Sequence, residues 1–364
     1  MITTNVGGKV RLGFSPYTYA RVAAMKSMLF KKGDYDKILK MGPIEALRFL
    51  QDTHYKKEME EFDISSKGIK NIDAALNASL MRSFMKLYII SDLKMQRVIS
   101  TYLLRYDLEN IKIILRSKFT KVNIEEVEPL LYSSLHYSKE FMKQLLSKNS
   151  GEEVLNSIDF LKKEKVRAAI KRYSNKKNNS QNILTQRIGN FAGLDLFEME
   201  NMLDVYYLEL LWQFSSTLGG QGKKVAMFLH QEIEATNIKT IIKLKLAKYK
   251  GDIFSYLVHP SRFVLHLASM EKELGEMVRF LHQHKFTSLT GEEKDLLPRL
   301  EIDLDVSLLK KEQLLMHQSL LSANSILGYL FAKEIEVRNL KALVKGKKLG
   351  VDEKYLEQLL VIAK

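Results

Sequence analysis

The stretch DLENIKIIL, residues 107–115, recurs twice with the same spacing, as EATNIKTII at residues 234–242 and as EVRNLKALV at residues 336–344. The shared pattern is an acid, two free positions, asparagine, isoleucine or leucine, lysine, one free position and two aliphatic residues. Each copy leads into a short linker and a second short predicted helix. A pattern that occurs three times in the same order indicates an internal repeat, in which one helical unit is used several times.

The asparagine of each copy is expected on a buried stripe of a helix. Residues four positions before it and four after it lie on the same face, and these neighbours are large: Tyr106 and Ile114, Ile233 and Ile241, Ile335 and Leu343. A buried amide without hydrogen-bond partners costs about 1–3 kcal/mol per group. One interpretation is a ligand site. The other, which we favour, is that each asparagine bonds to the backbone of the neighbouring helix or turn and fixes its register.

We therefore single out one asparagine and one lysine in each copy and assign them to the structure of the repeat. They are Asn110, Lys112, Asn237, Lys239, Asn339 and Lys341. The three lysines are expected on the opposite side of the helix, in contact with solvent. A fourth, degenerate copy is expected at residues 21–29, where alanine replaces the asparagine.

The composition predicts an all-α protein of more than one domain. A chain of 364 residues is long for a single hydrophobic core, and 46% hydrophobic residues supply enough apolar side chains for two or three. Helix breakers are scarce, with 5 prolines and 18 glycines, so we expect long helices and few strands or none. Residues 71–115 read as one nearly unbroken helical stretch, whereas residues 173–182 (YSNKKNNSQN) read as a loop.

The sequence argues against most kinds of catalytic or metal site. The absence of cysteine removes disulfides and thiolate chemistry and suits a reducing compartment. The glycine-rich stretch GGQGKK, residues 219–224, is not a phosphate-binding loop, because Thr217 stands where the first glycine is needed and a lysine replaces the metal-binding hydroxyl. The pair His282 and His284 has no carboxylate at a ligand spacing, so we expect a solvated helix end. Acids such as Glu58 stand beside lysines and are expected on solvated faces. We expect no catalytic residue, no metal site and no cofactor.

The chain is basic, with 57 lysines and arginines against 43 acids and a formal net charge of +14. Residues 162–177 (KKEKVRAAIKRYSNKK) are the most basic stretch and could meet nucleic-acid phosphates, anionic lipids or an acidic protein. A solvated helix or a dock for an acidic protein is favoured over nucleic acid, because no known nucleic-acid motif accompanies it. No run of about 18 apolar residues predicts a transmembrane helix. Residues 1–11 lack the apolar core of a secretory signal, so we expect a soluble, intracellular protein.

A resemblance to a known family rests on the N-terminal segment and on the repeats. YARVAAMKSML at residues 19–29, the short helix at 35–41 and FLQDTHYK at residues 49–56 closely resemble the C subunit of archaeal and bacterial A/V-type ATP synthases. The counterpart in the vacuolar proton ATPase is its d subunit. The repeated segments look like the internal repeats of the same family, and the resemblance extends from about residue 17 to residue 360. Residues 173–182 do not match the family's pattern.

The resemblance implies three similar helical lobes around a pseudo-threefold axis, in the form of a funnel. We place these lobes at residues 1–135, 136–262 and 263–364, and the repeat count leads us to expect that the N- and C-terminal segments pack together to complete one of them. It also implies a non-catalytic subunit of the central rotor, peripheral to the cytoplasmic side of the cell membrane. Its partners would be the membrane proteolipid ring and the central stalk, in ATP synthesis linked to proton or sodium transport. The alternative is a standalone basic helical-repeat adaptor or a nucleic-acid-binding protein.

Overall fold

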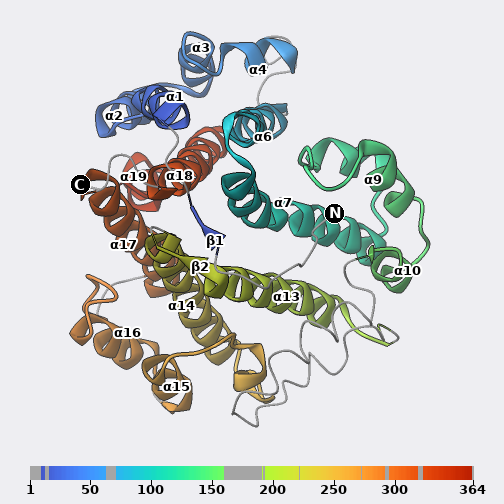
Figure 1. Ribbon diagram of the computed structural model, residues 1–364, viewed down its shortest axis with the longest axis vertical. Coiled ribbons are helices and arrows are strands. Elements are labelled where there is room, and N and C mark those ends of the chain that lie inside the picture. The colour runs from blue at the N-terminus through green and yellow to red at the C-terminus, as the bar shows by residue number, and fades with distance from the viewer. Residues whose placement is uncertain are drawn as a thin grey trace. The chain divides into compact units, whose positions relative to one another are not determined.

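The computed structural model describes residues 10–12, 16–62, 71–159, 191, 193–220, 222–271, 273–291, 295–318 and 323–362. Within these ranges the chain is helical apart from one pair of very short strands (Figure 1), as the composition predicts. The predicted loop at residues 173–182 and the basic stretch at residues 162–177 lie outside the described residues.

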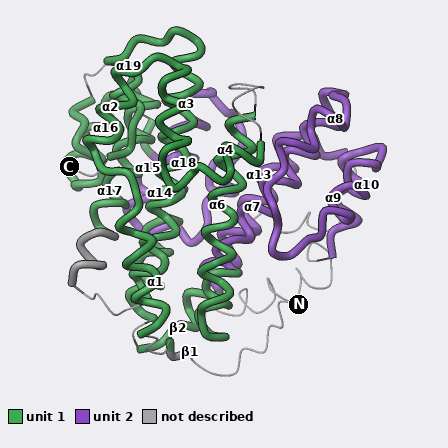
Figure 2. The backbone as a smooth tube through the Cα atoms, turned by 90° about the horizontal axis from the view of Figure 1, so that it is seen from above, with its two compact units in different colours: residues 1–100, 214–235, 270–364 green, residues 101–213, 236–269 purple. Residues whose placement is uncertain are grey.

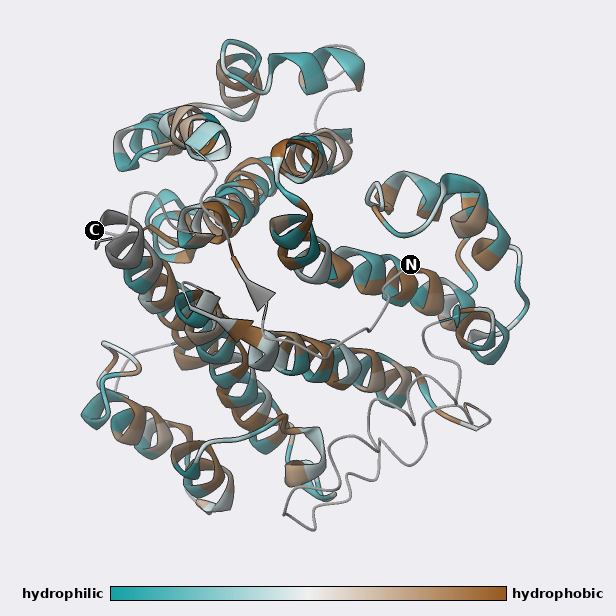
Figure 3. Cartoon of the chain, in the orientation of Figure 1, coloured by the Kyte–Doolittle hydropathy of each residue, from teal (hydrophilic) through white to brown (hydrophobic). Residues whose placement is uncertain are grey.

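Long helices follow one another in three pairs. The pairs are α6 (Ile72–Ile90) with α7 (Leu93–Thr120), α13 (Leu196–Thr217) with α14 (Gly222–Leu246), and α17 (Leu296–Gln318) with α18 (Ala323–Lys348). Each repeat asparagine lies in the second helix of a pair. Figure 3 shows apolar and polar residues interleaved along these helices, so each has side chains for a core as well as for other surroundings.

Short helices occupy the remaining described segments. Before the first pair come α1 (Pro16–Ser27), α2 (Lys32–Lys40), α3 (Pro43–Gln51) and α4 (Lys56–Glu61). After α7 come α8 (Ile124–Val127), the 3₁₀ helix η2 (Glu128–Leu130), α9 (Lys139–Leu146) and α10 (Gly151–Asn156). After α14 come the 3₁₀ helix η4 (Ile253–Tyr256), α15 (Arg262–Ser269) and α16 (Leu274–Gln283), and α19 (Glu353–Leu359) follows α18.

The predicted, nearly unbroken helical stretch over residues 71–115 is interrupted at one point, the connection of α6 to α7. Ser91 has extended backbone angles, and α7 begins after Asp92. The Asp92 carboxylate accepts hydrogen bonds from the backbone N–H groups of Lys94 and Met95, at 2.9 and 2.8 Å. An aspartate in this position satisfies the unpaired N–H groups of a helix start, which explains why a new helix begins here.

The glycine-rich stretch at residues 219–224 spans a strand end, a turn and a helix start. Strand β2 (Leu218–Gly219) pairs in parallel with β1 (Val10–Arg11), with Arg11 opposite Gly219. Gly220 has a φ of +59°, a left-handed angle that glycine adopts without steric cost, and Gly222 begins α14. The strand pair is two residues long on each side, consistent with the prediction of few strands or none.

Two compact units divide the chain (Figure 2). The first comprises residues 1–100, 214–235 and 270–364, and the second comprises residues 101–213 and 236–269. Three of the boundaries fall inside α7, α13 and α14, so each of these helices belongs to both units, and the fourth follows the last residue of α15. The division into lobes at residues 135 and 262 stays a prediction.

Helix α18 is the centre of the first unit. It contacts α1, α3, α6, α17 and α19, and α19 in turn contacts α2. Side chains on all sides of α18 are buried, including Leu327, Leu330, Leu340 and Val344. A helix surrounded in this way must be apolar around most of its circumference. The N-terminal and C-terminal segments therefore lie against each other in this unit.

The second unit packs short helices against the long ones. Gly151, the first residue of α10, lies where an added Cβ would come within 3.0–3.2 Å of Met199, Leu115 and Phe119. In both units together, none of the helices described is long and apolar enough to cross a membrane.

Gly291 lies where two backbone segments of the first unit are in close contact. Its φ is +90°, and a Cβ there would lie 2.3 Å from the carbonyl oxygen of Gly275 in α16. Gly350 has a similar φ of +69° but nothing within 4 Å of an added Cβ.

We expect Gly350→Ala to lower the free energy of unfolding by about 1–2 kcal/mol, the cost of a left-handed alanine. Gly291→Ala should lower it by about 1–3 kcal/mol more, because its Cβ also clashes with the Gly275 carbonyl. Urea unfolding measures both, and equal losses would contradict the close approach.

Candidate functional site

Each repeat asparagine is buried and bonded twice to a single backbone residue farther along the chain. Asn110 donates to the Tyr132 carbonyl at 3.0 Å and accepts from its N–H at 2.7 Å. The distances are 2.8 and 3.0 Å between Asn237 and Val258, and 2.9 and 3.0 Å between Asn339 and Val361. The three asparagine residues are at most 1% exposed. We call each of these pairings an asparagine clamp.

The clamp holds the chain just beyond the second short helix of each copy. The partner stands 21 or 22 residues after the asparagine in every copy, after η2, η4 or α19. An amide side chain offers a donor and an acceptor side by side, so it can replace a backbone neighbour for both groups of one residue. The large residues four positions away on either side are buried, as the helical spacing predicts.

The expectation that the repeat lysines contact solvent is wrong for Lys112. Its side chain is 8% exposed, and its Nζ lies 2.5 Å from Asp204 Oδ1 and 3.2 Å from Glu109 Oε1. Burial lowers the pKa of Lys112, but the charges of Asp204 and Glu109 outweigh it, so the pKa is raised. The periodicity of α7 alone could not show that α13 would supply an acid on this side.

The equivalent lysines of the other copies are half-buried. Lys341 donates to the side-chain oxygen of Asn77 in α6, and burial lowers its pKa to about 8. Lys239 is partly covered as well. The roles that we assign to the three asparagines and three lysines stay predictions, and the distances above define their surroundings.

A second lysine, eight residues after the asparagine, binds the end of a neighbouring short helix. Lys118 in α7 donates to the carbonyl of Leu146, the last residue of α9. Lys347 in α18 donates to the carbonyls of Leu39 and Met41 at the end of α2, both at 2.6 Å. A cation at a helix C-terminus satisfies free carbonyls and opposes the negative end of the helix dipole. The N-terminal helix α2 thus takes the place beside α18 that α9 takes beside α7.

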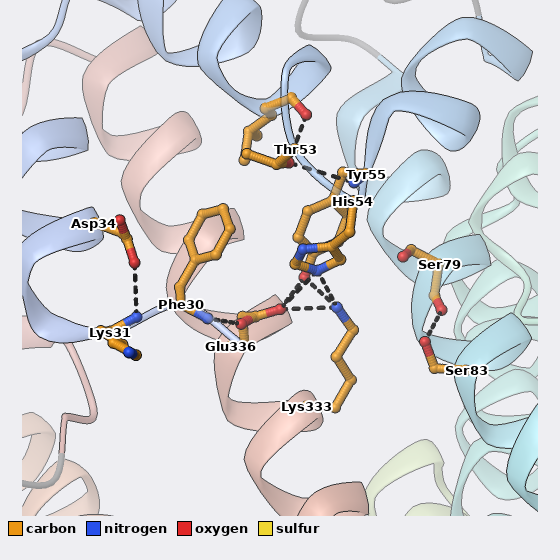
Figure 4. Close-up of polar contacts among 11 residues, drawn as sticks. Phe30, Lys31, Asp34, Thr53, His54, Tyr55, Ser79, Ser83, Lys333 and Glu336 are labelled. Atoms are coloured by element: carbon orange, nitrogen blue, oxygen red, sulfur yellow. Dashed lines mark hydrogen bonds and ion pairs between the residues drawn. The ribbon is translucent and has the colours of Figure 1, made fainter. Parts of the chain in front are cut away.

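A buried network of charged and polar groups connects the N-terminal motif to the third copy (Figure 4). The Lys333 ammonium in α18 donates to Glu336 Oε1 and to the Tyr55 hydroxyl, both at 2.8 Å, and to His54 Nε2 at 2.9 Å. The Tyr55 hydroxyl donates to Glu336 Oε1 at 2.6 Å, and the backbone N–H of Phe30 donates to Glu336 Oε2 at 2.5 Å. The three protons of an ammonium and both oxygens of the carboxylate therefore have partners.

Burial and charge act in opposite directions on the groups of this network. The side chains of Lys333 and Glu336 are 1% and 2% exposed. Burial raises the pKa of Glu336, but the Lys333 charge and the hydrogen bonds from Lys333 and Tyr55 outweigh it and bring the pKa to about 2. Burial also raises the pKa of Tyr55, so its hydroxyl keeps the proton that it donates. The Lys333 ammonium also lies 4.1 Å from the centre of the Tyr55 ring, within range of a cation–π interaction.

The acid of the first copy has a related but smaller set of partners. Asp107 is 1% exposed, lies 2.5 Å from His136 Nδ1 and accepts a hydrogen bond from the Ser134 hydroxyl. A histidine therefore accompanies the repeat acid in both cases. In the first copy it follows α7 in sequence, whereas in the third copy it comes from the N-terminal segment.

Sequence reasoning missed Lys333 and misplaced Glu58. Lys333 directly follows the apolar run ILGYLFA, residues 326–332, and a lysine at the end of such a run is the signal that could have identified it. Glu58, expected on a solvated face, is 4% exposed and forms an ion pair with Arg82 of α6. Its neighbour Glu60 is exposed as expected.

The histidine pair of the sequence analysis does not belong to a metal-ligand cluster in the part of the chain that the structure describes. His282 and His284 are exposed at the end of α16, as expected. No group of three or more histidine, cysteine, aspartate or glutamate residues in the described ranges is arranged to hold a metal ion.

Comparison with known proteins covers the repeats and the buried network together. The family model of the ATP synthase (C/AC39) subunit matches residues 18–359. The chain belongs to this family. The A-type ATP synthase C subunit of Methanococcoides burtonii is 30% identical over 95% of this chain and 94% of its own length. The C subunits of Archaeoglobus fulgidus and Haloferax volcanii are 28% and 27% identical, each over 95% of this chain and at least 96% of their own length. The resemblance to the A-type family is therefore confirmed, and the link to the vacuolar d subunit stays a prediction.

Substitution of the clamp asparagines should cost stability according to the burial of their partners. Asn237→Leu leaves both backbone groups of Val258 unpaired in a site that is 0% exposed, and we expect a loss of about 2–5 kcal/mol. Asn110→Leu should cost less, because Tyr132 is half-buried and water can replace the amide. Thermal and urea unfolding measure both. A loss for Asn110→Leu as large as that for Asn237→Leu would contradict this account, and an unchanged melt of Asn237→Leu with lost assembly would make Asn237 a contact residue.

The buried network predicts a particular dependence of stability on pH. The pKa of Glu336 is lower in the folded protein than in the unfolded chain, where it is about 4.3, so the ionised carboxylate stabilises the fold above that value. This contribution is lost as the pH falls toward about 2. Glu336→Gln should therefore lower the free energy of unfolding by about 3–5 kcal/mol at pH 7, because Lys333 stays buried without its counter-charge, and the difference from wild type should shrink below pH 4.

The double variant Lys333→Met, Glu336→Leu is the control for the single substitution. It removes both charges, so it should recover most of the stability that Glu336→Gln loses. A Glu336→Gln variant whose deficit is constant from pH 7 to pH 2 would show that the carboxylate charge does not act as described.

Proposed function

We propose that the chain is a non-catalytic subunit of the central rotor of an A-type ATP synthase, a socket that couples the central stalk to the membrane proteolipid ring. The observation that carries the proposal is the family match over residues 18–359, together with relatives named as C subunits that align over nearly their whole length. The protein is then peripheral to the cytoplasmic face of the membrane and acts in ATP synthesis linked to transport of protons or sodium ions.

The packing of the repeats supports a mechanical role. A part that passes torque between an axle and a ring must resist twisting, and close-packed helical interiors resist deformation. Each clamp uses two hydrogen bonds to one buried or half-buried backbone residue, so a short helix cannot slide along the long one without breaking both at once. Lys118 in α7 and Lys347 in α18 hold the ends of the short helices α9 and α2 by hydrogen bonds to their carbonyls.

Recovery of partners from membranes tests this function. The tagged full chain, expressed in cells that make the ATP synthase, should bring down proteolipid and central-stalk subunits after detergent extraction. Purified alone, it should show no ATP hydrolysis, and Lys223→Ala with Lys224→Ala should leave that result unchanged. Recovery of the chain without other synthase subunits, or with RNA that survives high salt, would overturn the rotor assignment and favour an adaptor or a nucleic-acid-binding protein.

A further inference from the structure

Three exposed apolar side chains belong to one corner of the first unit, where α1 begins and α6 is connected to α7. Tyr17, at the start of α1, is 63% exposed, and Ile89 and Leu93, on either side of the α6–α7 connection, are 70% and 78% exposed. The Thr18 hydroxyl donates to the Ile90 carbonyl at 2.8 Å, which fixes the start of α1 beside the end of α6. We call this place the α1–α6–α7 corner, defined by residues 16–21 and 86–97.

Each apolar side chain of the corner has a basic residue one helical turn farther into its own helix, away from the helix end at the corner. Arg21 follows Tyr17 by four positions in α1, Lys86 precedes Ile89 by three in α6, and Arg97 follows Leu93 by four in α7. Residues at these spacings lie on the same face of a helix, about one turn of 5.4 Å apart. The three basic side chains are exposed, as is a fourth, Lys94.

Charge in the corner is strongly one-sided. The two segments hold four basic residues and a single acid, Asp92, whose carboxylate is engaged with the backbone at the start of α7. Lysine is depleted in the buried centre of protein–protein interfaces, where arginine is enriched, so it is the two lysines of the corner that argue against such a centre. At a bilayer surface, however, basic side chains pair with anionic headgroups while aromatic and aliphatic ones enter the boundary with the acyl chains.

We propose that the α1–α6–α7 corner is a contact site for an anionic phospholipid surface. Tyr17, Ile89 and Leu93 enter the boundary between headgroups and acyl chains, and the basic residues one turn behind lie at the level of the phosphates. Single exposed hydrophobic residues are common on soluble proteins. Three at the adjoining ends of different helices, each with a basic residue one turn away, form a surface with an apolar edge and a cationic rim. The partner is lipid, and the proposal goes beyond a role in joining two protein assemblies.

Vesicle binding of the purified full chain tests the proposal. Wild type should co-sediment with vesicles of phosphatidylcholine plus phosphatidylglycerol, weakly with phosphatidylcholine alone, and less as salt rises. The double variant Ile89→Ser, Leu93→Ser should lower the partition coefficient at least about tenfold. Lys86→Gln with Lys94→Gln should reduce binding to the anionic vesicles and flatten the salt dependence, with little effect on binding to the neutral ones.

Leu349 offers a matched control for the apolar part of the surface. It is 77% exposed at the end of α18, in the same unit, and carries the same side chain as Leu93. Leu349→Ser should bind vesicles like wild type. All of these positions are exposed, so the melting temperatures should be unchanged. Absence of wild-type binding to anionic vesicles, or equal losses in Leu349→Ser and Ile89→Ser, Leu93→Ser, would overturn the proposal.

A fluorescent label can report the position of the corner directly, because the chain has no native cysteine. An environment-sensitive dye on Leu93→Cys should shift to shorter wavelength with anionic vesicles, whereas the dye on Leu349→Cys should not. A shift of the Leu93→Cys signal only with vesicles that contain the proteolipid ring, and none with lipid alone, would overturn the lipid assignment in favour of a protein partner. Such a result would leave the proposed rotor function standing, and failed recovery of synthase subunits would leave the lipid result standing.

Discussion

The two hydrogen bonds of each asparagine clamp are the constraint on which the repeat depends. A short helix that follows a long one ends with backbone groups that the helix itself cannot pair. In this protein the N–H and carbonyl of the second residue beyond the short helix are buried or half-buried, and the amide of one asparagine supplies both partners. No hydrocarbon side chain could do so, which explains a polar residue in the middle of an apolar stripe.

The clamp also fixes where the rest of the first copy starts. Once the end of the short helix is tied to α7, the loop that follows starts from a defined place, and α9 can reach Lys118, eight residues after the asparagine. In the third copy, α2 of the N-terminal segment takes this place beside Lys347. Lys118 and Lys347 complete that arrangement by binding the carbonyls at the ends of α9 and α2. The asparagine clamp and the lysine at the helix end are directional contacts, and they fix the positions of helices that are otherwise held by non-directional hydrophobic packing.

The sequence was informative where one helix determined the outcome and failed where two helices met. The buried asparagine stripe, the all-helical class and the short second helices follow from spacing within single segments. The burial of Lys112 depends on Asp204 in α13, and that of Glu58 depends on Arg82 in α6, so neither could be read from its own helix. The break at Ser91 and Asp92 was missed because strong helix formers flank it on both sides and only the capping carboxylate of Asp92 marks it. Lys333 was missed because an apolar run reads as core, and a buried ammonium requires partners from a segment far away in sequence.

That distance bears on the number of polar partners of Glu336 in the third copy, which exceeds that of Asp107 in the first. In the first copy the acid and its histidine are 29 residues apart, whereas in the third copy the acid and Tyr55 are 281 residues apart. Loop closure grows with the logarithm of length, so joining the more distant segments costs about 2 kcal/mol more in chain entropy. Asp107, which joins nearby segments, has a serine and a histidine as partners. Glu336 accepts hydrogen bonds from a buried lysine, a tyrosine and a backbone N–H, all within 2.8 Å. Hydrogen bonds to charged groups each contribute about 1.5–3 kcal/mol, which is enough to offset the longer loop. The extra partners therefore occur at the copy whose acid is bonded to the N-terminal segment, at the other end of the chain.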